Sequence, residues 1–276
     1  MERELSDTLK QIARGNKRIT ALTGAGISAE SNIPTFRGPE GYWTVGSREY
    51  HPQEMATLTM FRTQPEEVWR WYLYRYGVCR RATPNPGHTA LAEMEHLFND
   101  RFTLITQNVD GLHLRAGNSP DQTFQIHGNI FFMRCSRPCS ESLYPIPKHV
   151  QGKQKDEPLT DADRELIRCP ACGDYARPHV LWFDEAYNES YYKFHSSLKV
   201  AADTELLLIV GTSGATNLPN QIAWVVNQAG GCIIDINIEP NPFTRIALGG
   251  ERGFFIQAPS GTALAEILEV FKEAME

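Results

Sequence analysis

The chain has 276 residues, of which 41% are hydrophobic and 10% aromatic, and its formal net charge is −6. This composition supports a substantial core and excludes a globally disordered chain. The negative charge argues against direct nucleic-acid binding, and no stretch approaches the roughly 18 unbroken apolar residues of a membrane span, so neither partner is expected.

The first segment, residues 1–18, mixes acidic and basic side chains at helical spacing and predicts a helix over Glu4–Arg14. It lacks the apolar core of a signal peptide and the acid-poor character of a transit peptide. A cytoplasmic location is therefore expected.

A glycine-rich turn follows the short apolar run Ile19–Leu22, which is predicted to be a buried strand. The turn reads Gly-x-Gly-x-x-Ala from Gly24 and opens into a predicted helix. Such a turn binds the phosphates of dinucleotides, because glycines let the backbone approach a pyrophosphate and a helix N-terminus supplies N–H groups. Short glycine patterns recur by chance. Here, however, the turn runs into Pro34-Thr35-Phe36-Arg37, which an ordinary dehydrogenase turn does not do.

Residues 38–86 carry aromatic and charged side chains at helical spacing, broken by prolines, and predict an insertion of short helices. Within it, Tyr72 and Arg75 are three residues apart and share a helix face. A phenol beside a guanidinium is well suited to grip a carboxylate. Taken alone, the residues favour a blander alternative, in which Tyr72 belongs to an aromatic core and Arg75 to the solvated face.

The next predicted elements are a helix over His88–Phe98 and a strand over Phe102–Thr106, which ends at the polar string Gln107-Asn108-Val109-Asp110. Polar residues just past parallel strands collect at the ligand crevice. His127 follows the next apolar residues, and an imidazole that titrates near neutrality suits proton removal. A lone histidine is more often a core or surface group.

The segment 131–180 differs in composition, with several prolines and two cysteine pairs, Cys135/Cys139 and Cys169/Cys172. Four thiolates suit a closed, structural zinc site, and four ordinary reduced cysteines are the alternative. The polar stretch Gln151–Pro158 predicts a mobile loop. Cys79 and Cys232 are assigned no function.

From Asp203 onward, strands and helices alternate again. The predicted strands are Leu206–Val210 and Ile233–Ile238, and the predicted helices are Gln221–Gln228 and Gly261–Lys272. Continuous apolar strands with helices between them indicate a parallel sheet covered on both faces. The fold is therefore predicted to be α/β, a Rossmann-like parallel sheet with a small zinc-binding lobe and a helical insertion. The expected domains are a discontinuous NAD-binding domain (1–37, 87–130 and 181–276), the insertion (38–86) and the zinc lobe (131–180).

Five strings, in a fixed order, resemble the sirtuins, the NAD-dependent protein-lysine deacylases. They are Gly24–Gly38, Thr106–His113, Ile126–Asn129, Gly211–Ser213 and Asn237–Glu239. Together they span most of residues 19–258, so the chain is identified as a member of that family.

The resemblance implies which residues bind NAD. They are Gly24, Ala25, Gly26, Ser28, Glu30, Ile33, Phe36, Arg37, Trp43, Gln107, Asn108, Asp110, Gly211, Thr212, Ser213, Asn237, Ile238, Glu239 and Ala258. Phe36 would shield the reactive ribose carbon, and Glu239 would accept hydrogen bonds from both ribose hydroxyls of the adenosine half.

The resemblance also implies the chemistry. His127 would be the catalytic base, with Asn108 and Asp110 holding the nicotinamide ribose and a water. The acyl oxygen would attack the ribose carbon, nicotinamide would leave, and free lysine and 2′-O-acyl-ADP-ribose would follow. The four cysteines would hold Zn²⁺, although sirtuins typically place two residues, not three, between the first two ligands.

For the protein substrate, the resemblance implies strand addition of an acyl-lysine peptide along the predicted strand Pro178–Glu185. The contacting residues would be Val180, Trp182, Phe183, Asp184 and Glu185. Many sirtuins carry glycine where this chain has Asp184, which leaves the peptide register open.

The acyl preference is implied by Ala56 together with Tyr72 and Arg75. Sirtuins that remove succinyl and malonyl groups combine a small pocket residue with a Tyr-x-x-Arg pair, and here the resemblance reverses the blander interpretation. Acetyl-lysine should be the poorer substrate. The alternatives are mainly deacetylation, an NAD glycohydrolase or protein ADP-ribosyltransferase on the same pocket, and a non-catalytic NAD-sensing module.

Overall fold

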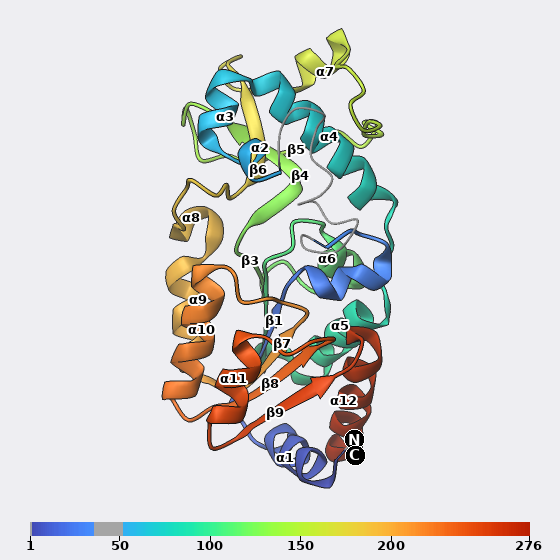
Figure 1. Cartoon of the computed structure of the whole chain (residues 1–276), viewed down its shortest axis with the longest axis vertical. Coiled ribbons are helices and arrows are strands. Elements are labelled where there is room, and N and C mark those ends of the chain that lie inside the picture. Colours follow the sequence, from blue (N-terminus) through green and yellow to red (C-terminus); the bar gives the residue numbers. More distant parts are fainter. Residues whose placement is uncertain (1, 36–51) are drawn as a thin grey trace.

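The computed structural model describes residues 2–35 and 52–276. Figure 1 shows two sheets of unequal size arranged along the long axis, with both chain termini at the end of the larger sheet. Within the described ranges, no helix has the length and apolar character needed to cross a membrane.

The larger sheet has six parallel strands in the order β3-β2-β1-β7-β8-β9. Their bounds are β1 Arg18–Thr23, β2 Phe102–Thr106, β3 Thr123–Gln125, β7 Thr204–Val210, β8 Cys232–Asn237 and β9 Gly253–Gln257. The chain runs outward from β1 in one direction and from β7 in the other. The point between β1 and β7 is therefore the topological switch point, where ligands of such sheets bind.

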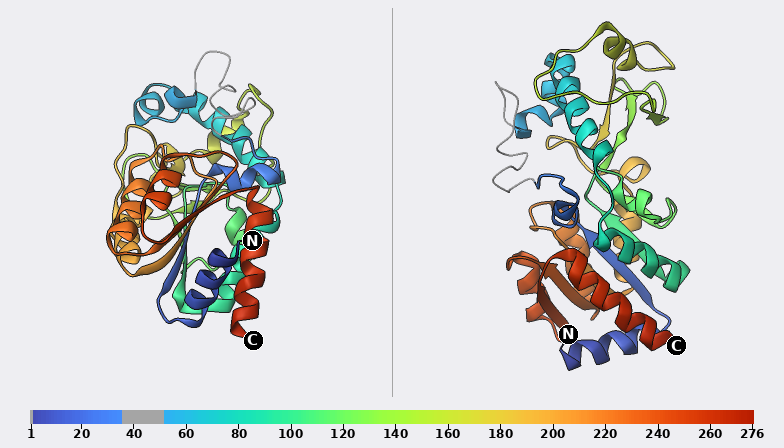
Figure 2. Two further views of the ribbon diagram at one scale, coloured as in Figure 1. Left: turned by 60° about the horizontal axis from the view of Figure 1, so that its bottom comes forward. Right: turned by 90° about the vertical axis from the view of Figure 1, so that its right-hand side faces the viewer.

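Helices cover both faces of this sheet (Figure 2). One face packs against α1 (Arg3–Arg14), α5 (Pro86–Phe98) and α12 (Ser260–Met275), and the other against α9 (Phe194–Ala202), α10 (Asn217–Gln228) and α11 (Pro242–Gly249). Strand β7 supplies both cores, because successive side chains of a strand point to opposite faces. Leu206 and Leu208 belong to one apolar cluster, and Leu207 and Ile209 to the other.

The smaller sheet is antiparallel, in the order β5-β4-β6. Its strands are β4 Gly128–Cys135, β5 Tyr144–Pro145 and β6 Ala176–Val180, and the helices beside it are α2 Pro52–Met55, α3 Leu58–Thr63 and α4 Pro65–Arg81. Trp69 on α4 donates its indole N–H to the Ala176 carbonyl at 2.8 Å, which ties that helix to β6. The remaining short elements are η1 Ala25–Ser31, η2 Asn99–Arg101, α6 Leu112–Ala116, α7 Asp161–Leu166 and α8 Glu189–Tyr192.

The predicted fold class is confirmed: a parallel sheet covered by helices, a helical insertion and a smaller lobe with a four-cysteine cluster. Apart from the strand predicted over Pro178–Glu185, each predicted strand and helix is present, with α10 beginning four residues earlier than expected. The edge strands β3 and β9 were not predicted. β3 has only three residues, and the apolar run of β9, Phe254–Ile256, is also only three residues long, so both signals are short.

The stretch Gln151–Pro158, predicted to be a mobile loop, has a defined place against α4. The Lys153 N–H donates to the Leu73 carbonyl at 3.1 Å, and a Cβ on Gly152 would lie 2.4 Å from the Gly77 Cα. Two glycines facing each other let the loop backbone touch the helix backbone. Sequence reasoning missed this contact because the glycines are 75 positions apart along the chain.

Candidate active site

Two glycine-containing turns meet at the switch point between β1 and β7. The Gly26 N–H donates to the Gly211 carbonyl at 2.8 Å. A Cβ on Gly26 would lie 2.6 Å from the Gly211 Cα, and one on Gly24 would lie 2.6 Å from the Thr212 Cβ. Glycine is required because the two backbones touch. The helix predicted after the first turn is the 3₁₀ helix η1, Ala25–Ser31.

The residues after β2 are bonded to the first turn. The Asn108 side-chain amide donates to the Gly24 carbonyl and to the Ser28 hydroxyl, both at 3.0 Å. The Ser28 hydroxyl donates to the Asp110 carboxylate at 2.8 Å. Burial raises the pKa of Asp110. The structure thus brings together Asn108, Asp110 and Ser28, which the sequence had placed in two separate motifs.

The turn after β7 is linked to both of its neighbours. The Gln107 side chain donates to the Thr212 hydroxyl and accepts from the Thr216 hydroxyl, both at 2.8 Å. The Asn237 amide donates to the Thr212 carbonyl at 3.0 Å. Three loops at the carboxyl edge of the sheet are therefore held in one arrangement.

The outer part of the same edge presents Ser213, Ile238 and Glu239 to solvent, with Ile238 65% exposed. The Ala258 N–H donates to the Asn237 carbonyl at 3.2 Å, which places the loop after β9 beside them. A hydroxyl, a carboxylate and an exposed apolar side chain suit a phosphate, ribose hydroxyls and an adenine respectively. The donor set therefore fits an NAD molecule laid across the loops.

Two predicted cofactor residues have structural contacts within the chain. The Glu30 carboxylate accepts the Gly261 N–H at 2.9 Å, at the start of α12, and Ile33 is buried in the apolar cluster of the smaller sheet. Their contact with NAD stays a prediction. Phe36, Arg37 and Trp43 lie outside the described residues.

His127 immediately precedes β4 of the smaller sheet and comes two residues after β3 of the larger one. Its carbonyl accepts the Leu181 N–H at 2.9 Å. Gly128 has a φ of +86°, and a Cβ there would lie 2.1 Å from the His179 carbonyl oxygen. Glycine at this position lets the chain turn sharply and brings His127 against the segment that follows β6.

The His127 imidazole is neutral at physiological pH, because burial lowers its pKa to about 4. The backbone of Gln107, the residue before Asn108, acts in the opposite sense and raises the pKa of the ring, but burial has the larger effect. The imidazole Nε2 lies 2.7 Å from the Tyr187 hydroxyl. The structure thus places the predicted base beside the polar string that follows β2, as a neutral group able to accept a proton.

Tyr72 and Arg75 are both buried on α4, with 1% and 3% of their surfaces exposed. The Tyr72 hydroxyl accepts the Trp182 indole N–H at 2.9 Å, and a hydroxyl that accepts one hydrogen bond can also donate one. The Arg75 guanidinium lies 4.6 Å from the Trp71 ring centroid. The alternative that Arg75 lies on a solvated helix face is therefore wrong. The positive charge of Arg75 also lowers the pKa of buried Asp110, against the larger effect of burial.

The predicted substrate strand is shorter than expected. β6 ends at Val180, and the Glu185 N–H donates to the Trp182 carbonyl at 3.0 Å, which closes a turn. The Phe183 N–H donates to the Ala56 carbonyl at 3.0 Å, and the Phe183 side chain is 56% exposed. The prediction of a continuous strand through Glu185 was wrong, since the backbone after Val180 bonds to the helical insertion instead.

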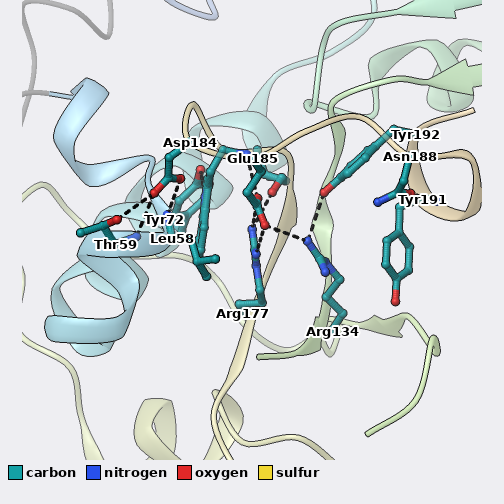
Figure 3. A network of polar contacts seen from close by, with 12 residues as sticks. Leu58, Thr59, Tyr72, Arg134, Arg177, Asp184, Glu185, Asn188, Tyr191 and Tyr192 are labelled. Atoms are coloured by element: carbon teal, nitrogen blue, oxygen red, sulfur yellow. Dashed lines mark hydrogen bonds and ion pairs between the residues drawn. The ribbon is translucent and has the colours of Figure 1, made fainter. Parts of the chain in front are cut away.

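Asp184 and Glu185 point in opposite directions and fix this turn on both sides (Figure 3). The Asp184 carboxylate accepts the N–H groups of Leu58 and Thr59, at the start of α3, at 2.7 and 3.0 Å. The Glu185 carboxylate accepts two hydrogen bonds from the Arg177 guanidinium at 2.5 and 2.7 Å. The Asp184 carboxylate is therefore hydrogen-bonded within the chain, to the start of α3.

Arg177 and Arg134 were not singled out from the sequence. Arg177 is 3% exposed at its side chain, stacks 3.5 Å from the Trp182 ring centroid and shares Glu185 with Arg134 (Figure 3). A single arginine in a sequence does not reveal its partner, because the partner depends on how β6 and the turn after it fold. The glutamate eight residues later was the one available hint.

The four predicted metal ligands form a compact cluster. The sulfur atoms of Cys135, Cys139, Cys169 and Cys172 lie within 4.8 Å of one another. The Sγ atoms of Cys135 and Cys172 are 3.6 Å apart, and those of Cys139 and Cys169 are 3.7 Å apart. Tetrahedral zinc with Zn–S bonds of about 2.3 Å requires an S–S separation of about 3.8 Å. The donor set therefore fits Zn²⁺ despite the three-residue spacing.

These features define a class: a dinucleotide-binding α/β protein with a second sheet stapled by four cysteines. The Sir2 family profile matches residues 24–217. The chain belongs to the Sir2 family.

Relatives and solved structures agree with that assignment. An NAD-dependent protein deacylase of Pyrococcus furiosus is 39% identical over 265 residues, covering 96% of this chain and 97% of the relative. One from Leptospira interrogans is 38% identical, covering 91% and 92%. A Sir2 homologue solved with NAD has a TM-score of 0.81 at 32% identity and covers 100% of this chain and 96% of its own.

Proposed function

We propose that this chain is an NAD-dependent protein-lysine deacylase that prefers acidic acyl groups, succinyl and malonyl, and removes acetyl more slowly. Membership of the Sir2 family and the donor set at the carboxyl edge of the sheet support the NAD-dependent reaction. The acyl preference is supported by one observation in particular: Tyr72 and Arg75 are buried together on one face of α4.

A buried guanidinium and a phenol that can donate its proton favour a substrate that brings a carboxylate between them. Arginine offers a rigid pair of donors, and hydrogen bonds to a charged group are worth about 1.5–3 kcal/mol. Ala56, whose carbonyl is bonded to the turn after β6, is a small, buried residue at the start of the same insertion. An acetyl group brings no carboxylate that Arg75 could bind.

When bound, NAD supplies a ribose carbon that accepts the acyl oxygen as nicotinamide leaves. Asn108 and Asp110 would orient the ribose, since both are fixed to Ser28 in the first turn. His127 would take a proton from a ribose hydroxyl at Nε2, because its imidazole is neutral. The peptide would add along β6, which is an edge strand of the smaller sheet.

The test compares one peptide carrying succinyl-lysine or acetyl-lysine, with products identified by mass. We expect Arg75→Met to reduce the succinyl kcat/KM by about 10- to 100-fold and to leave the acetyl value within about threefold. Arg70→Met is the matched control, because Arg70 lies on the same helix but pairs with Glu67 at the surface. An acetyl preference that does not depend on Arg75 would overturn the acyl assignment. Nicotinamide release without any acyl peptide would instead favour an NAD glycohydrolase.

A further inference from the structure

The strongest feature that the proposed reaction does not use is a tyrosine beside the base. The Tyr187 hydroxyl lies 2.7 Å from His127 Nε2, and the two ring centroids are 5.8 Å apart with an interplanar angle of 33°. Tyr187 comes from the segment between β6 and α8, whereas His127 precedes β4 (Figure 1). A distance of 2.7 Å is that of a well-formed hydrogen bond.

The other contacts of the imidazole determine the direction of this bond. The backbone of Gln107 raises the pKa of the His127 ring, as a carbonyl that accepts a ring N–H does, and we therefore assign the ring N–H to that carbonyl. In a neutral imidazole one nitrogen carries the proton and the other carries the lone pair. With Nε2 facing Tyr187, the proton lies on Nδ1, and the phenol donates its O–H to the lone pair of Nε2.

Tyr187 is held in place by its own neighbours. Its ring stacks on Phe194 with centroids 6.2 Å apart, and its hydroxyl also contacts the Thr216 side chain. Burial raises the pKa of Tyr187 to about 12, so the phenol keeps its proton throughout the neutral range. Glu185, two residues earlier, is bonded to Arg177, and Asn188, the next residue, caps α8.

We propose that Tyr187 is a positioning residue for His127. Its hydroxyl keeps the lone pair on Nε2 and the proton on Nδ1, and it holds the ring in one orientation until substrate binds. This proposal rests on the proposed role of His127 as the base. It also connects the turn that follows the proposed peptide strand with the base, because the same short segment contains Trp182 and Tyr187.

In the proton transfer, a ribose hydroxyl replaces the phenol as the donor at Nε2. Its O–H bond breaks, an N–H bond forms at Nε2, and the electron pair stays on the ribose oxygen. The imidazolium that results keeps its Nδ1–H on the Gln107 carbonyl. The phenol neither gains nor loses a proton, and it is left with the Thr216 side chain as its partner.

The first test needs no ligand. Nitrogen-15 NMR of the histidine side chains should show His127 as the Nδ1–H tautomer in the free protein. In Tyr187→Phe we expect a mixture of tautomers and a higher pKa for His127, because the lost bond had stabilised the neutral ring. Burial and the Gln107 carbonyl are the causes of the His127 shift, and no charged group is among them. An unchanged tautomer and titration in Tyr187→Phe would overturn the proposal.

The second test separates the two halves of the reaction. Tyr187→Phe should lower the kcat of deacylation by about 5- to 10-fold, while nicotinamide exchange into NAD, which precedes proton removal, stays within about twofold. In a His127→Ala background, the same substitution should cause no further loss. Equal losses in exchange and deacylation, or additive losses, would show a merely structural role and overturn the proposal.

Tyr191→Phe is the matched control, since Tyr191 lies four residues further on and packs against Arg134 rather than His127. It should leave the His127 resonances and both rates unchanged. If the proposed function itself were wrong, the result would be different: neither the parent protein nor any variant would turn over acyl-lysine. The NMR experiment would still test the contact between Tyr187 and His127, because it needs no turnover.

Discussion

The two sheets of this protein differ in the contacts that stabilise their outer parts. The larger sheet has central strands that are buried on both faces, and apolar clusters from six helices cover it. The smaller sheet has three strands and shares an apolar cluster of its own with α3 and α4, and its periphery is also fixed by a four-cysteine cluster, the Glu185 contacts with two arginines, and a loop docked on α4. Both halves therefore have an apolar core. The half with the larger sheet, called here the nucleotide half, relies mainly on that core, whereas the half with the smaller sheet, where we propose that the substrate binds and which is called here the substrate half, adds several specific contacts.

The largest effect is expected when two of the four cysteines beside the smaller sheet are replaced, because this removes proposed zinc ligands from that half and leaves the larger sheet unchanged. In Cys139→Ser/Cys172→Ser, both substituted side chains are exposed, so no core cavity is created. Because structural zinc contributes directly to folding, we expect deacylation to fall by at least about 100-fold. Hydrogen exchange should accelerate across residues 128–180 and stay slow in β7.

The control for this experiment is Cys232→Ala, a buried cysteine of the larger sheet. It should cost about 1 kcal/mol of stability and leave the zinc content unchanged. If the double variant lost its zinc and kept full turnover, the smaller sheet would not depend on the cluster.

A second substitution tests the loop that docks on α4. Gly152 has a φ of +84°, and its Cβ would collide with Gly77, whereas Gly230, in the larger half, has a φ of +73° and open space around it. We expect Gly152→Ala to lower the free energy of unfolding in urea by about 2 kcal/mol more than Gly230→Ala does. Both variants strain a backbone with positive φ, but only the Gly152 variant also adds an overpacked contact. The KM for succinyl-peptide should also rise in Gly152→Ala, since α4 carries Arg75. Equal costs would mean that the loop and helix separate freely.

The smallest expected effect is a difference in pH dependence between two histidines. Burial, with the charges of Arg134 and Arg177, lowers the pKa of His179 to about 3. Its contribution to stability is therefore present above the unfolded pKa of about 6.5 and is lost as pH falls toward the folded value. Between pH 6.5 and 5.5 this loss is about 1 kcal/mol.

The measurement is urea unfolding of His179→Gln across that interval, where the pH dependence should be shallower than in the parent by this amount. His96, an exposed histidine on α5, supplies the control as His96→Gln, which should leave the slope unchanged. A parent-like slope in His179→Gln would mean that folding does not lower the pKa of His179.

The nucleotide half could be predicted closely from the sequence because its signals are local. Leu206–Val210 is a continuous apolar run, and Gly24 and Gly26 follow a strand at fixed spacing, so a strand-and-turn interpretation needs no long-range contact. The predicted strand Phe102–Thr106 agrees with β2 at both ends. The four cysteines gave an equally clear signal, since two close cysteine pairs in one segment are typical of a metal site.

The substrate half could not be predicted to the same depth. Tyr72 and Arg75 were assigned a role through resemblance, but whether Arg75 is buried depends on how α4 packs against Trp182 and the smaller sheet. The turn after Val180 depends on the bonds from Asp184 to α3, 125 and 126 positions away in sequence.

The sequence by itself determined the fold class, the nucleotide-binding edge and the ligand set for zinc, because strand periodicity, glycine turns and cysteine pairs act over a few neighbouring residues. Only the tertiary structure decided that Asp184 is engaged by α3, that Arg177 and Arg134 share Glu185, and that Tyr187 faces His127. Hydrogen bonds and ion pairs between distant segments are fixed by packing geometry, and no local pattern encodes them.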